Sequence, residues 1–131
     1  MDSPPPLFFT GVERFNGGAF LEAHELWEDL WRASSAPSRD FLQGLVQISA
    51  GFVHAQRGNR KGAISLCAKG LHRLAPYPGC FWRIDLDALR REVAQWRETF
   101  RLATGEEGER RLPFPLIVLV DPCTPFPTPG S

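Results

Sequence analysis

The chain has 131 residues, enough for one domain that buries about two thirds of the surface its unfolded form exposes. Lysine and arginine together number 15, as do aspartate and glutamate, so the formal net charge is zero. Because no basic run marks a surface that could follow a phosphate backbone, we expect no nucleic-acid partner.

The three cysteines, Cys67, Cys80 and Cys123, stand far apart and form no Cys-x-x-Cys pair. An odd and scattered set favours reduced thiols. The N-terminus has no basic region ahead of an apolar stretch, and the longest apolar run, PLIVLV, is too short to span a bilayer. These features predict a cytoplasmic protein with no membrane partner.

Local signals predict helices along the first part of the chain. Thr10 and Glu13 have the spacing of a capping box, which indicates a short first helix. Gly58-Asn59 supplies a terminal glycine followed by a new cap, so the third and fourth helices should form an antiparallel hairpin. Asp85 opens a last helix whose apolar residues recur with helical spacing. The expected ranges are 11–16, 19–33, 38–57, 60–74 and 85 to about 105.

The chain changes character after residue 111 and becomes rich in proline. We expect a helical domain over residues 1–111 and an extended proline-rich tail over residues 112–131, packed on the domain or partly disordered. Its β-branched run at 117–120 has no strand partner elsewhere in the sequence, so it should lie over the helices or pair with another copy. The predicted fold class is all-α, a compact bundle of about five helices with a proline-rich extended C-terminal tail.

Helical geometry separates the polar residues of the second helix. At about 100° per residue, His24 falls inside the apolar stripe and Glu28 lies at its flank. Glu22 and Asp29 point the opposite way and should face solvent. Glu25 lies about 100° from His24, either at the edge of the core or in solvent.

The third helix is apolar nearly all round, which indicates a central, buried helix. Gln43, Gln47 and His54 nevertheless share one sector of about 60°. A buried polar group without a partner costs about 1 to 3 kcal/mol, so something polar should face this stripe. Since His24 and Glu28 are the inward-facing polar residues of the other long helices, we expect the two helices to meet with these groups opposite one another.

Two imidazoles and a carboxylate on facing helices can bind a divalent metal. His24-Glu25-x-x-Glu28 is similar to the zinc metalloprotease motif, in which a ligand, a general base and a second ligand stand at these positions. This predicts a zinc, manganese or iron site held by His24, Glu28 and His54. His24, Glu25 and Glu28 are the candidate catalytic residues. The residues expected to orient the ligands or a small-molecule substrate are Gln43 and Gln47.

Other interpretations stay open. A network of amides and imidazoles bonded to Glu28 would fix helix register without any chemistry. His24 with Glu28 or Glu25 would be able to act as acid and base without a metal. The stretch AQRGNRKGAISLCAKGLHRL is similar to the turn of a tetratricopeptide hairpin, which favours a non-enzymatic interaction or oligomerisation module acting through self-association or tail docking.

Several linked motifs carry a family resemblance. RFNGGAFLEAHELWEDLW followed by FLQGLVQISAGFVHAQRGNRKGAISL resembles the domain of unknown function 309 family in its Phe-Asn-x-Gly, His-Glu-x-x-Glu-x-x-Trp, Phe-Leu-Gln-Gly and Arg-Gly-Asn motifs, over about residues 15–74. The resemblance implies a compact all-helical domain and a metal-dependent hydrolase. The family's polar signature falls on His24, Glu25, Glu28, Gln43, Gln47 and His54.

Overall fold

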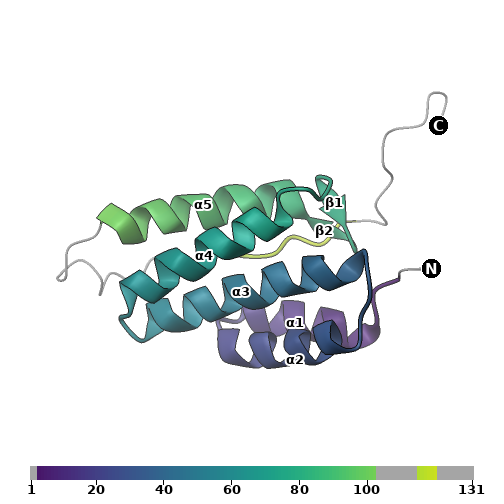
Figure 1. The fold of residues 1–131 in the computed structure, drawn as a ribbon. Helices are drawn as coiled ribbons and strands as arrows, with labels where there is room; N and C mark the ends of the chain where they lie inside the picture. The colour runs from purple at the N-terminus through teal and green to yellow at the C-terminus, as the bar shows by residue number, and fades with distance from the viewer. Residues whose placement is uncertain (1–2, 103–114, 121–131) are drawn as a thin grey trace.

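The computed structural model describes residues 3–102 and 115–120, which form helices and one short hairpin (Figure 1). The helices are α1 (Pro6–Asn16), α2 (Phe20–Arg32), α3 (Ser38–Gln56), α4 (Arg60–Leu74) and α5 (Leu86–Leu102). Between α4 and α5, β1 (Cys80–Phe81) pairs with β2 (Ile84–Asp85) in an antiparallel hairpin. The all-α fold class is confirmed. The predicted domain boundary after residue 111 and the predicted end of the last helix near residue 105 lie outside the described residues.

The first helix begins earlier than predicted. It starts at Pro6 with no side-chain cap, so the predicted capping box over 10–13 is wrong. Proline suits a first turn because that turn needs no N–H there. The extra turn buries Phe8, whose carbonyl accepts a hydrogen bond of 3.2 Å from Trp27 Nε1. Gly11 allows this contact, since a Cβ there would lie 2.2 Å from the same nitrogen.

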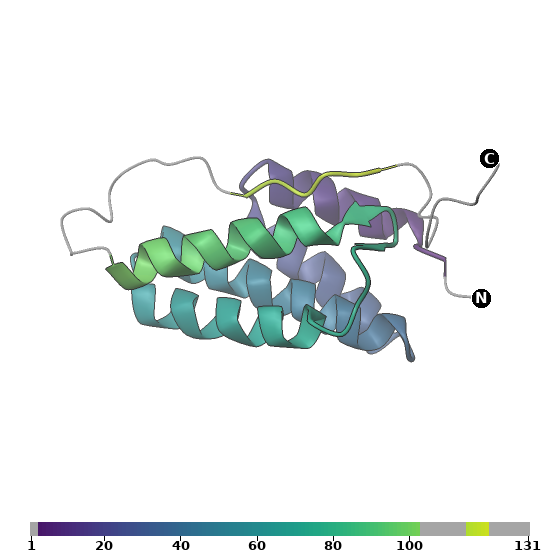
Figure 2. The same ribbon diagram turned by 90° about the horizontal axis from the view of Figure 1, so that it is seen from above.

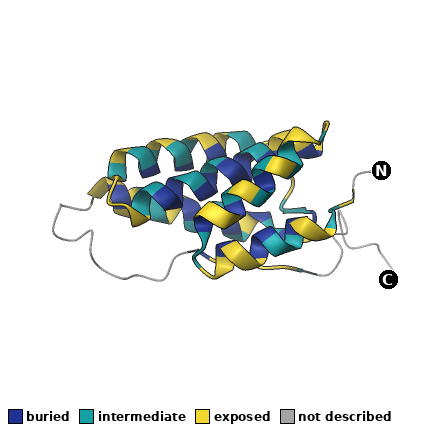
Figure 3. Cartoon of the chain, turned by 90° about the horizontal axis from the view of Figure 1, so that it is seen from below, coloured by how far each residue is buried: buried dark blue, intermediate teal, exposed yellow. Residues whose placement is uncertain are grey.

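The third helix is the centre of the bundle, with α2 packed on one side and α4 on the other. Figure 3 shows buried positions where the helices face one another and exposed ones on the outer surfaces. The contact with α4 is close, because a Cβ at Gly70 would lie 2.5 Å from Ile48 Cγ1 and 2.8 Å from the Gly44 carbonyl oxygen. The predicted ranges of α2, α3 and α4 agree with the structure to within one residue at each end. The apolar side chains of α3 that are at most 1% exposed are Phe41, Leu42, Leu45, Ile48 and Phe52.

A third extended segment, residues 115–120, joins the hairpin and runs beside α1 (Figure 2). Leu119 bridges Ile84 of β2 in antiparallel fashion, with backbone hydrogen bonds of 2.9 and 2.8 Å on either side of the pair. The Asn16 side chain both donates to and accepts from the Ile117 backbone, at 3.0 and 2.7 Å. The expectation that this run has no strand partner is therefore wrong, and the partner is β2.

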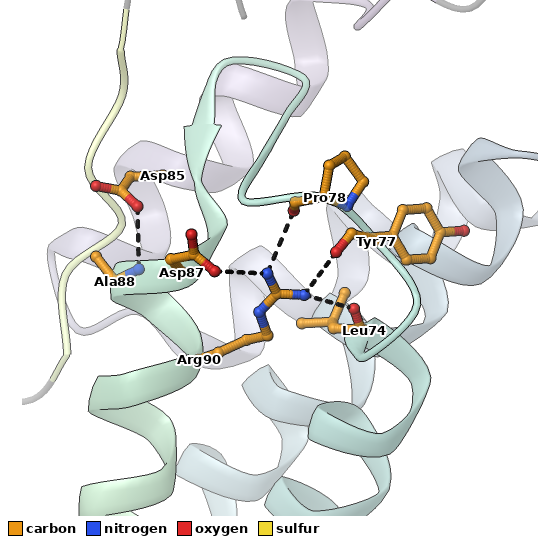
Figure 4. Close-up of polar contacts among 7 residues, drawn as sticks. All are labelled: Leu74, Tyr77, Pro78, Asp85, Asp87, Ala88 and Arg90. Atoms are coloured by element: carbon orange, nitrogen blue, oxygen red, sulfur yellow. Dashed lines mark hydrogen bonds and ion pairs between the residues drawn. The ribbon is translucent and has the colours of Figure 1, made fainter. Parts of the chain in front are cut away.

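One arginine ties the end of α4 to the start of α5 (Figure 4). The Arg90 guanidinium donates to the carbonyl oxygens of Leu74 at 2.8 Å, Tyr77 at 2.9 Å and Pro78 at 3.3 Å. It also pairs with Asp87 at 2.8 Å. The last carbonyl groups of a helix have no hydrogen-bond donor within the helix. Arg90 supplies such a donor for α4, and it also holds the segment that leads from α4 to the hairpin.

The cysteines are not all reduced. Cys67 is a free, buried thiol, whereas Cys80 is disulfide-bonded, so the expectation of reduced thiols is wrong at that position. Burial raises the pKa of the Cys67 thiol to about 12. Across residues 3–102 and 115–120, we find no helix with the length and apolar character needed to cross a membrane. The cytoplasmic location stays a prediction.

Candidate functional site

The polar sector of α3 is half-buried rather than buried. Gln43, Gln47 and His54 all have intermediate exposure, as does Ala50 between them, whereas most of the helix around them is buried. The sector lies on the side of α3 that is left open between α2 and α4, because those helices pack on its two flanks. Water can therefore reach part of this sector, although Gln47 Oε1 itself is buried, and this lowers the penalty that would require a polar partner.

His24 fastens α2 to the main chain of α3. Its Nδ1 lies 3.2 Å from the Val46 carbonyl oxygen, and the histidine is partly buried. Because a carbonyl can only accept, we assign the ring proton to Nδ1. The Nε2 atom of the neutral ring is then left with its lone pair, as in histidines that serve as bases or metal ligands.

A second contact fixes how α2 and α3 are aligned. The Arg39 guanidinium lies 4.7 Å from the Trp31 ring centroid and donates to the Trp31 carbonyl at 3.3 Å. The Trp31–Arg39 contact and the His24–Val46 contact together set an antiparallel register of α2 on α3. In this register Glu28 is level with Gln43. The bond of His24 to Val46 marks this edge between the two helices, and a place for Glu28 and Gln43 beside it follows from helical geometry.

His54 lies at a different place, the turn between α3 and α4. Its Nδ1 is 3.1 Å from Asn59 Nδ2, while Asn59 Oδ1 accepts the backbone N–H of Gly62 at 3.0 Å and caps α4. The cap can be predicted from the sequence, but its bond to His54 depends on the shape of the turn. His54 is eight residues beyond the carbonyl that His24 contacts, which is about 12 Å along a helix rising 1.5 Å per residue.

The predicted metal ligands do not fit a shared ion in this structure. A protein zinc site needs three or four donors at about 2.0 to 2.3 Å, so its ligands lie only a few ångströms from one another. His54 is too far along α3 to meet His24, and the Glu28 carboxylate lies 3.5 Å from Arg32 Nη2. Within the described part of the chain, no group of three histidine, cysteine, aspartate or glutamate residues could hold a metal ion. We therefore derive no reaction step through zinc, manganese or iron.

The remaining predicted residues differ in their surroundings. Glu25 is exposed on α2. Of the two positions that the sequence allowed for it, the edge of the core or solvent, the structure therefore shows solvent. Gln47 Oε1 is buried and has no hydrogen-bond partner among the described residues. The roles predicted for Glu25 as a base and for Gln43 and Gln47 as orienting residues stay predictions.

Comparison with known proteins supports the resemblance seen in the motifs. The family model described as Domain of unknown function (DUF309) matches residues 8–66. This segment of the chain is similar to the DUF309 family. The DUF309 match includes most of α1, all of α2 and α3 and about the first half of α4, and it contains all six polar residues singled out in the sequence. No curated protein matches the chain.

Within the DUF309 segment, the polar residues fall into two groups. His24 contacts α3 at Val46, and helical geometry puts Glu28 and Gln43 on the same edge, whereas His54 belongs to the turn that starts α4. Each histidine holds a different junction of the bundle.

Proposed function

We propose that this protein is a non-enzymatic interaction module that pairs with a second copy of itself, and that its two histidines serve the architecture. The observation that supports a structural role is their separation. His24 bonds to the α3 main chain, and His54 bonds to the residue that caps α4. Each histidine thus uses its Nδ1 atom to hold a junction of the bundle.

The surface proposed for pairing is the outer side of residues 115–120. Leu116, Val118 and Leu119 are 52%, 47% and 41% exposed, whereas Ile117 is 3% exposed. The hydrogen bonds that flank the Leu119 bridge use the neighbouring residues, so the N–H and C=O of Leu119 itself point away from β2. Ile117 points the same way, but its N–H and C=O are bonded to the Asn16 side chain. Among the described residues, the segment therefore presents exposed apolar side chains and the backbone groups of Leu119.

A second copy is the occupant that fits this surface best. Proteins usually protect an exposed strand edge with charged side chains, and residues 115–120 contain none. Two copies can meet about a twofold axis through the exposed apolar side chains of this segment, because the same residues then meet on both sides. The formal net charge of zero gives two copies no overall repulsion. A contact of six residues per copy is small, so we expect a weak dimer.

Sedimentation equilibrium of the full chain tests this proposal. We expect the average mass to rise from monomer towards dimer as the protein concentration increases, with a dissociation constant on the order of 10 to 100 μM. Val118→Lys should abolish the rise, because it places a charge at the twofold contact without disturbing the core. Leu21→Lys is the matched control, since Leu21 is 45% exposed on α2. A wild-type protein that stays monomeric, or a Val118→Lys protein that still dimerises, contradicts the proposal.

Zinc titration of the metal-stripped protein, followed by native mass spectrometry, tests the structural role of the histidines. We expect no stoichiometric zinc. If one zinc ion binds with micromolar affinity or better and is lost in His24→Ala, the histidine is a metal ligand and the non-enzymatic assignment is wrong.

An acid–base function at His24 without a metal is the second candidate. One observation favours it, namely that the Val46 carbonyl fixes the ring so that Nε2 keeps its lone pair, with Glu28 one turn along the same helix. Hydrolysis of p-nitrophenyl acetate by the wild type and by His24→Gln measures this directly. Equal rates in the two proteins exclude a base at this position for ester hydrolysis.

A further inference from the structure

A cavity opens at the end of the bundle where the α3–α4 turn meets the last turn of α5. Its volume is about 390 Å³, which is within the size range of small-molecule sites. None of the residues predicted as a site from the sequence lines it. The lining residues are Gly58, Asn59, Arg60, Lys61, Ile64, Phe100 and Arg101.

The charged lining residues within 3–102 and 115–120 are basic. Arg60, Lys61 and Arg101 contribute three cations, and no carboxylate from these described ranges lines the cavity. Arg101 is paired with Glu98 on the outside of α5 through Nε at 3.1 Å and Nη2 at 2.5 Å, which leaves its Nη1 donors. In the part of the chain that the structure describes, no ion pair involves Arg60 or Lys61. Among the described lining residues, Arg60 and Lys61 therefore bring positive charge that no ion pair neutralises.

The same cavity also has an apolar wall. Phe100 is 9% exposed, and its ring packs against Phe52 at 5.8 Å and Trp96 at 5.6 Å between centroids, so it is held in place. Ile64 supplies a partly exposed aliphatic surface from α4. A rigid ring beside cationic groups suits a ligand with an anionic end and an apolar body.

We infer that this cavity binds a small organic anion, a phosphate or carboxylate attached to an apolar group. The Arg60, Lys61 and Arg101 side chains hold the anionic end, with Arg able to donate two parallel hydrogen bonds to such a group. Phe100 and Ile64 contact the apolar body. At the start of α4 the Gly62 N–H is already bonded to Asn59, so that donor does not serve the anion.

Amide chemical shifts of the full-length protein, titrated with phenyl phosphate, test the inference. We expect saturable shifts confined to residues 58–64 and 100–101, with a dissociation constant in the range of about 0.1 to 5 mM. Inorganic phosphate should bind at least about fivefold more weakly, since it lacks the apolar contact, and phenol should give no saturable shift.

Charge-removing variants locate the site. Lys61→Gln should weaken phenyl phosphate about two- to fivefold, as expected for one exposed charge contact, and Arg60→Gln with Lys61→Gln about tenfold. Lys69→Gln is the matched control, because Lys69 is exposed on the same helix but does not line the cavity. Circular dichroism of each variant checks that the helices are intact.

The inference is overturned by any of three results. The first is that the chemical shifts do not saturate below about 20 mM phenyl phosphate. The second is that the double variant and the wild type bind phenyl phosphate with equal affinity. The third is that the wild type binds inorganic phosphate as tightly as phenyl phosphate. The last result would reduce the site to one for free phosphate. None of these outcomes depends on whether the protein dimerises through residues 115–120.

Discussion

Arg90 offers the sharpest test of how the bundle is held together. Its side chain is 20% exposed and donates to three main-chain oxygens at the end of α4 and after it. A hydrogen bond from a charged donor contributes about 1.5 to 3 kcal/mol, but these three share one guanidinium and the freed carbonyls can regain water. The pair with Asp87 adds little, because that carboxylate is 62% exposed. Arg90→Ala should therefore lower the free energy of unfolding by about 2 to 4 kcal/mol.

Urea denaturation followed by far-ultraviolet circular dichroism measures this loss. Arg90→Lys should recover less than half of it, because an ammonium cannot reproduce the planar fork that reaches several carbonyls. Arg91→Ala is the matched control, since Arg91 is exposed on the same helix and should change the free energy by less than about 0.5 kcal/mol. If Arg90→Ala is no more destabilising than Arg91→Ala, the side chain does not fasten α4 and the reasoning fails.

Three further predictions follow from buried contacts. Gly11→Ala should destabilise the protein by about 1 to 3 kcal/mol in the same urea assay, because its Cβ would lie 2.2 Å from a buried indole nitrogen; Gly17→Ala, with its nearest atom at 3.4 Å, should cost far less. Burial raises the pKa of Cys67 to about 12, so iodoacetamide at pH 8 should modify it no faster than the protein unfolds, as peptide mass spectrometry would show; fast modification would refute its burial. Asn16→Ala should cost about 1 to 3 kcal/mol and speed amide exchange in residues 115–120, whereas unchanged exchange would mean that this side chain does not hold the segment.

The middle of the fold could be predicted because its signals are local. Gly58 and Asn59 end one helix and begin the next within two residues, and the glycine has the positive φ of 79° that this turn requires. The start of α1 could not be predicted in the same way. It depends on Phe8 packing against Trp27, which is a tertiary contact between two helices.

The hairpin and its third segment escaped prediction for a related reason. Trp82 and Arg83 occupy the turn with positive φ values of 49° and 65°, a conformation for which the usual signals are glycine and asparagine. Packing holds this turn instead, since the Trp82 ring lies 5.0 Å from the Phe8 ring and is 8% exposed. Arg83 Nε also donates to the Val120 carbonyl at 3.0 Å. Because the residues that hold this turn are far from it in the sequence, no local pattern of residue types predicts it.

The candidate site shows that the spacing of residues predicts their angle around a helix but not which residues of a neighbouring helix they meet. The spacing of Gln43, Gln47 and His54 correctly puts them in one sector of α3, because the angle around a helix follows from residue number alone. Whether His24 meets them depends on its height along α3, which is set by the register of one helix on another. That register follows from the contacts of His24 with Val46 and of Trp31 with Arg39, and it leaves His54 about 12 Å from the point where His24 touches α3. Residues on facing sides of two helices therefore form one site only when the register of the helices also puts them at the same level along the axis. Here the contacts place His24 and His54 at different junctions.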